Sequence, residues 1–250
     1  MLDIGWEVLT LLIITGGVAG FIDAVAGGGG LLTMPALLFA GLSPAQAVAT
    51  NKLQGSFGTF SAVRYFIKQG LLKPQNHLPE VVAVFVGAML GAIAIQLINP
   101  EFLGVIMPWV LIAVACYFLL TPAIGDIEKE AKLSKLAVLG MMFSIGAYDG
   151  FFGPGTGTFF ALILVVFSGL SLKAATAQAK LYNFTSNIVS LAVFIVGGNV
   201  VWQVGLMMAL GQSTGAYLGA KMVHFKGVKI IRPITIVMCI AMSMALIIKG

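Results

Sequence analysis

Four charged side chains interrupt segments that otherwise read as lipid-embedded, and they limit what this chain can fold into. Asp23 and Lys52 lie in the first half, and Asp149 and Lys180 lie in the second. In each half a glycine-rich break separates the aspartate from the lysine. Ionisable groups inside a membrane are costly and usually face a protein interior or a watery cavity. The chain is therefore expected to fold around a polar site or pathway.

The remainder of the chain is strongly apolar. Its 250 residues are 59% hydrophobic and only 9% charged, with a mean hydropathy of +1.04, whereas an average soluble domain is about 25% charged. This composition predicts an all-α polytopic membrane protein that contacts the lipid bilayer. The net charge of +5 does not indicate a nucleic-acid partner, because the basic residues mostly fall in short gaps between apolar runs.

The apolar runs form two sets of five, and the second run of each set is short. A run of about 20 residues crosses a hydrocarbon core, whereas one of about 12 does not cross unaided. The expected segments are 6–25, 31–42, 53–67, 81–98 and 102–120, then 136–152, 158–170, 181–196, 201–222 and 230–248. The predicted organisation is a first transmembrane repeat (1–124), a cytoplasmic linker (125–135) and a second transmembrane repeat (136–250).

The two halves match in residues as well as in rhythm. Asp23 overlays Asp149, and after a two-residue insertion Lys52 overlays Lys180. The same register places the Gly-Ala-x-Leu-Gly-Ala motif at 87–92 on its counterpart at 215–220. A register held for so long indicates an internal repeat.

The positions of the basic loops predict that the repeats are inverted. In the first half the basic gap lies between the third and fourth runs, whereas in the second half it lies between the fourth and fifth. Basic loops stay in the cytoplasm, so equivalent loops should lie on opposite sides of the membrane. We expect about five segments per repeat, both termini outside and the linker inside.

Each glycine-rich break precedes a short apolar run and suits an anion. The first contains Gly28, Gly29 and Gly30, and the second contains Gly155, Thr156 and Gly157. Such a loop at the start of a helix points free N–H groups and the positive end of the helix dipole at a ligand. We expect the two broken helices to meet near the midplane and bind a small anionic substrate.

The lysines and their polar neighbours are candidate substrate-binding residues. Lys52 and Lys180 supply positive charge, and nearby side chains supply hydrogen-bond groups: Asn51, Gln54, Gln178 and Asn183. The alternative is that each lysine pairs with the aspartate of its own half or extends to an interface. Asp23 and Asp149 have two roles open, because a carboxylate there could carry protons or support the glycine loop.

Other sequence features predict packing rather than chemistry. The Gly-Ala-x-Leu-Gly-Ala motifs are small-residue faces that let membrane helices approach closely, within one bundle or in a homodimer. Cys116 and Cys239 each lie in an apolar run and suggest neither a disulfide framework nor a metal site. No cofactor is expected.

These residues resemble the sulfite exporter TauE/SafE family of bacterial membrane permeases. The resemblance covers nearly the whole chain and rests on the stretches 28–35, 41–44, 49–52, 149–157 and 177–180. It implies secondary transport, usually export, of sulfite, organosulfonates or related sulfur-containing anions across the bacterial inner membrane. The residues themselves indicate an anion but do not distinguish sulfur oxyanions from carboxylates or phosphate.

Four other functions are alternatives to a secondary transporter. An intramembrane enzyme is not expected, because both histidines lie in or beside basic loops and no catalytic pair stands out in the core. Primary active transport would need a nucleotide-binding motif, and the chain has no Gly-x-x-x-x-Gly-Lys-Ser/Thr sequence. A passive anion channel could use the same loops and lysines, and a non-transporting scaffold would leave the buried charges without a purpose.

Overall fold

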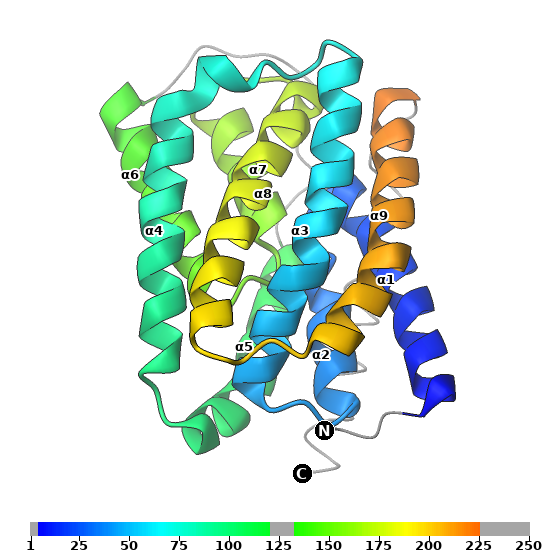
Figure 1. The fold of residues 1–250 in the computed structure, drawn as a ribbon. Coiled ribbons are helices and arrows are strands. Elements are labelled where there is room, and N and C mark those ends of the chain that lie inside the picture. Colours follow the sequence, from blue (N-terminus) through cyan, green and yellow to red (C-terminus); the bar gives the residue numbers. More distant parts are fainter. Residues whose placement is uncertain (1–4, 121–132, 226–250) are drawn as a thin grey trace.

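The computed structural model describes residues 5–120 and 133–225, which form a bundle of nine α-helices and one 3-10 turn (Figure 1). No strand occurs in this described part of the chain, so the predicted all-α class is confirmed. The elements are α1 (Trp6–Ala26), α2 (Gly30–Phe39), α3 (Pro44–Lys68), η1 (Pro74–His77), α4 (Leu78–Gln96), α5 (Pro100–Leu120), α6 (Lys135–Phe151), α7 (Thr156–Val166), α8 (Leu172–Val196) and α9 (Trp202–Phe225). The predicted segment 230–248 and most of the linker lie outside the described residues.

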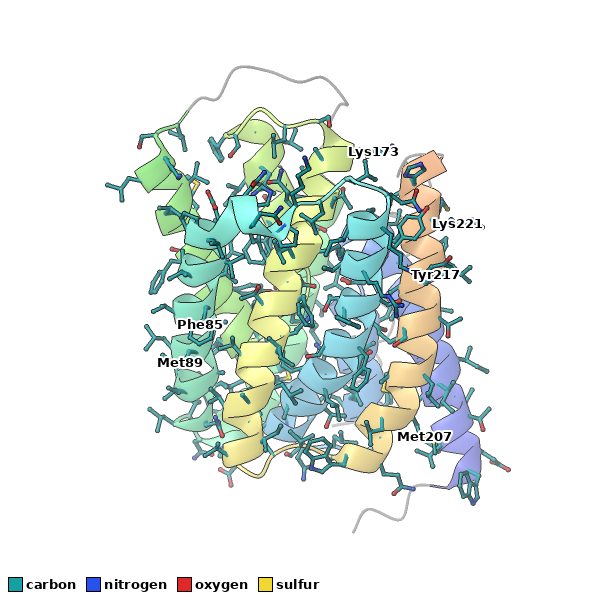
Figure 2. The ribbon with its side chains drawn as sticks, turned by 45° about the horizontal axis from the view of Figure 1, so that its top comes forward. Phe85, Met89, Lys173, Met207, Tyr217 and Lys221 are labelled. Atoms are coloured by element: carbon teal, nitrogen blue, oxygen red, sulfur yellow. The ribbon has the colours of Figure 1, made fainter. Side chains whose placement is uncertain are left out.

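Helix length and hydropathy fit a membrane protein. Among the described residues, four segments are long and apolar enough to span a bilayer: Trp6–Ala26, Pro74–Gln96, Pro100–Tyr117 and Leu172–Val196. α2 and α7 have only 10 and 11 residues, which confirms that the second run of each half is short. Apolar side chains also cover the outside of the bundle; Phe85, for example, is 45% exposed on α4 (Figure 2).

α3 and α8 begin earlier than the hydrophobic pattern predicts. We expected runs starting near 53 and 181, but the helices start at Pro44 and Leu172. Ser43 caps α3 in a capping box with Gln46, and Ser171 caps α8. Several polar side chains in these opening turns are buried, among them Thr50, Asn51 and Thr176. Because the helices begin early, Lys52 and Lys180 lie within long helices rather than at segment ends.

Glycines let two pairs of helices pack so closely that their backbones are in contact. α1 lies along α9, and α4 lies along α6. A β-carbon on Gly20 would lie 2.3 Å from the Gln212 carbonyl oxygen, and one on Gly150 would lie 2.0 Å from that of Ala88. The motif at 87–92 lies in the α4–α6 contact and its counterpart lies in the α1–α9 contact, which confirms that these motifs are packing seams within the bundle.

A polar layer separates two apolar clusters in the bundle. One cluster joins α2 and α5 to the first turns of α3 and the end of α8. The other joins α7 to the second half of α3 and the beginnings of α4 and α6. Between them lie the four buried charges together with buried amide and hydroxyl side chains. Lys52 and Lys180 thus lie within α3 and α8, whereas Asp23 and Asp149 lie in the last turns of α1 and α6.

Basic side chains gather at one end of the bundle. Lys173 and Lys221 lie at the same end in Figure 2, where α3 also ends with Lys68 and α6 begins with Lys135 (Figure 1). The opposite end carries the α8–α9 connection and the start of α1, near Glu7. This asymmetry is the kind that orients a membrane protein.

Candidate functional site

The two glycine loops contact each other directly. A β-carbon on Gly27 would lie 2.2 Å from the backbone nitrogen of Thr158, and one on Gly157 would lie 2.7 Å from the Gly27 α-carbon. Gly27 also has a φ of +77°, a conformation that side-chain-bearing residues rarely adopt. The Thr158 hydroxyl donates a hydrogen bond to the Ala26 carbonyl. The loops of the two halves therefore form one unit.

The buried charges pair across the halves of the chain. Lys52 Nζ lies 2.8 Å from Asp149 Oδ1, and Lys180 Nζ lies 2.8 Å from Asp23 Oδ2. The alternative in which each lysine pairs with the aspartate of its own half is wrong. The sequence pattern groups these residues by half, but the helices that carry them pack against the other half.

The two aspartates have different environments. Besides Lys52, Asp149 accepts hydrogen bonds from the hydroxyls of Thr156 at 2.8 Å and Ser186 and from Asn183 Nδ2 at 3.3 Å. Its side chain is 1% exposed, whereas that of Asp23 is 12% exposed. Asp149 is therefore fixed by four donors from α3, α7 and α8, while Asp23 is held chiefly by its ion pair.

The loops and ion pairs surround a small polar cavity. The space within it that a water-sized group can occupy is about 30 Å³, well below the volume of typical ligand pockets. Its lining consists of six glycines, five amide side chains, two carboxylates and one threonine: Gly27, Gly30, Gly55, Gly153, Gly155, Gly157, Asn51, Gln54, Asn183, Asn187, Gln212, Asp23, Asp149 and Thr59.

The cavity contains half of the predicted substrate-binding residues and both aspartates. Those on its lining are Gly30, Asn51, Gln54, Gly155, Gly157 and Asn183, together with Asp23 and Asp149. The others, outside its lining, are Gly28, Gly29, Lys52, Thr156, Gln178 and Lys180. The two ammonium groups lie directly behind the lining: a β-carbon on Gly153 would be 2.9 Å from Lys52 Nζ, and one on Gly157 would be 3.1 Å from Lys180 Nζ.

Sequence reasoning missed several lining residues. Asn187 follows Asn183 by one turn of α8, and both overlay small or polar residues of α3, namely Thr59 and Gly55. From the predicted Asn183, the repeat register and the helical spacing together could have found Asn187, Thr59 and Gly55. Gln212 has no such signal, because it overlays the apolar Val84.

The glycine loops that join α1 to α2 and α6 to α7 meet at a polar cavity inside an apolar helical bundle. This arrangement defines a class of protein, a polytopic membrane transporter. Comparison with known proteins agrees. The family model described as "Sulfite exporter TauE/SafE" matches residues 12–246, so the chain belongs to the TauE/SafE family.

Relatives cover almost the whole chain. A probable membrane transporter protein of Haemophilus influenzae is 44% identical over 244 residues, 97% of this chain and 95% of the relative. The probable membrane transporter protein ORF9 of Sinorhizobium sp. is 41% identical over 99% of this chain and 95% of its own length. The probable membrane transporter protein YfcA of Escherichia coli K12 is 44% identical over 92% of this chain and 86% of its own length. No solved structure matches.

Proposed function

We propose that this membrane transporter is a secondary exporter of small sulfur-containing oxyanions, such as sulfite or organosulfonates, in the bacterial inner membrane. The family description supports the sulfur chemistry. The observation that carries the proposal is the polar cavity at which both α2 and α7 begin, because the lining includes Gly30 at the start of α2 and Gly157 in the first turn of α7. Helix starts present unpaired N–H groups and a partial positive charge.

The surroundings of the cavity suit an anion. Amide side chains from α3 and α8 can donate hydrogen bonds to oxyanion oxygens. Each lysine ammonium acts on the cavity across a single glycine. The predicted substrate-binding set, including Lys52, Lys180, Gln178 and Thr156, remains our proposal, with the lysines acting from behind the loops.

Reciprocal contacts support two inverted repeats. Gly20 packs on Gln212, and at equivalent positions Gly146 packs on Val84. The first helix of each half thus packs against the fourth helix of the other half, α1 against α9 and α6 against α4. α3 and α8, which overlay in the sequence repeat, run in opposite directions in Figure 1. This arrangement favours the division into repeats at 1–124 and 136–250 around a pseudo-twofold site.

The positions of the two apolar clusters support a mechanism of alternating access. Each lies on one side of the polar layer, so separating the helices within one cluster would open the cavity toward that side only. Asp149, with four donors, supports its loop. Asp23, which is more exposed and has fewer partners, is the carboxylate that would exchange a proton during the cycle.

Purified protein in liposomes should carry at least one small oxyanion in a saturable manner. The measurement is uptake of labelled sulfite, sulfoacetate, thiosulfate and chloride, with and without a pH gradient, compared with empty liposomes. Saturation is expected because each cycle presents one cavity. If no anion moves, the proposed function is wrong, and linear flux without saturation or coupling would favour a passive channel.

The basic end of the bundle should lie in the cytoplasm. A reporter fused after Gly70, between α3 and η1, should therefore report cytoplasm, and one after Gly198, between α8 and α9, should report the outside. Topology-sensitive enzyme fusions make this measurement in intact cells. The same location for both reporters would contradict the proposed orientation and the full span of α8.

A further inference from the structure

One corner of the cavity holds two carbonyl oxygens that have no hydrogen-bond partner among the described residues. They belong to Gln54 and Gln212, which are 1% and 3% exposed, and both side chains line the cavity. Buried polar atoms normally have a partner, and leaving one unpaired costs free energy. A ligand that occupies this corner would therefore gain by supplying a donor.

These two residues come together from different helices. A β-carbon on Gly58, one turn after Gln54 in α3, would lie 2.4 Å from Gln212 Cγ. The backbone of Gln212 packs against Gly20, one turn before Asp23 in α1. α1, α3 and α9 thus place two amide oxygens beside the more exposed carboxylate, so this corner is rich in acceptors.

Local hydrogen bonds fix the orientation of Gln54. Its Nε2 donates to Asn51 Oδ1 at 2.7 Å, and the same oxygen accepts from the Thr33 hydroxyl at 2.6 Å. This hydrogen bond holds the Gln54 amide nitrogen on the Asn51 side, so the carbonyl oxygen points the other way and is left without a partner among the described residues.

We propose that this corner selects an anion that carries its own hydrogen-bond donor, such as a hydroxyl, an ammonium or an acidic O–H close to the anionic group. The inference rests on the proposed function, since it requires the anion to bind in this cavity. The anionic group faces the glycine loops, and the donor faces Gln54 and Gln212. A metal cation fits less well, because the Lys180 ammonium already lies 2.8 Å from the Asp23 carboxylate and would repel it.

The test compares two ligands of nearly the same shape, 2-hydroxyethanesulfonate and 1-propanesulfonate, in which a methyl group replaces the hydroxyl. Binding is measured as the rise in unfolding temperature of the purified protein with ligand concentration. The hydroxyl compound should bind the wild type at least about tenfold more tightly, since the analogue leaves buried acceptors unpaired. Gln54→Met and Gln212→Met should each reduce this preference.

The matched control is Gln96→Met, because Gln96 lies at the end of α4, outside the cavity, and hydrogen-bonds to Ala92 and Asn199. It should keep the preference. Equal binding of the two sulfonates to the wild type, or binding of neither, would overturn the inference, while saturable sulfite flux would leave the proposed function standing. Stabilisation by sodium chloride but not choline chloride, lost in both glutamine variants, would assign the corner to a cation and also overturn it.

Discussion

Replacing Lys52 with methionine should lower the free energy of unfolding by about 3–5 kcal/mol, because it leaves the Asp149 carboxylate buried without its cation. Both side chains of this pair are at most 1% exposed, so solvent cannot take over the role of the ammonium. Thermal or denaturant unfolding in detergent measures the loss. Lys68→Met, at the exposed end of α3, is the control and should stay within about 0.5 kcal/mol of the wild type.

A second substitution in the Lys52→Met background identifies the true partner. Adding Asp149→Asn should recover much of the lost stability, because it removes the unpaired charge. Adding Asp23→Asn should instead lower stability further, because it leaves Lys180 unpaired as well. The opposite pattern, with recovery only through Asp23, would show that the pairs form within each half and would contradict the crosswise arrangement.

The sequence predicted the buried charges and the glycine breaks but not how they pair. An ionisable residue in an apolar run stands out whatever its partner is, and the repeat shows that the position recurs. Pairing depends on how the helices of one half pack on those of the other. That packing depends on glycine contacts such as Gly20 with Gln212. The small-residue motifs indicate which helix faces pack closely, but not which helix each face meets.

Hydrophobicity alone also misplaces the starts of α3 and α8. Hydrophobicity locates a segment that faces lipid, but the opening turns of these helices mix small apolar residues with buried polar ones, such as Thr50, Asn51 and Thr176. Their true starts were visible only as caps, at Ser43 and Ser171. The cavity lining was only half predicted. Loop glycines and neighbours of Lys52 were found because they lie beside the motifs in the sequence, whereas Gln212 lies on a different helix, far from both motifs.

Substitution of Gly27 by alanine should have the other large effect, on both stability and transport. Its φ of +77° is strained for alanine by about 1–2 kcal/mol, and the new β-carbon would lie 2.2 Å from the Thr158 backbone nitrogen. No flexible side chain can yield there, so the two loops must separate. We expect a loss of stability well beyond the strain alone, together with loss of saturable anion flux.

Gly41→Ala separates the two causes. Gly41 has a φ of +89°, so it carries the same kind of strain, but nothing lies within 4 Å of its β-carbon position. The variant should therefore show only the strain, with flux close to that of the wild type. Unfolding temperatures and sulfite flux of both variants decide the matter. Equal losses of stability and flux in the two variants would mean that contact between the loops contributes little. A much larger loss for Gly27→Ala would mean that the two halves hold the cavity in shape through direct backbone contact, for which position 27 must lack a side chain.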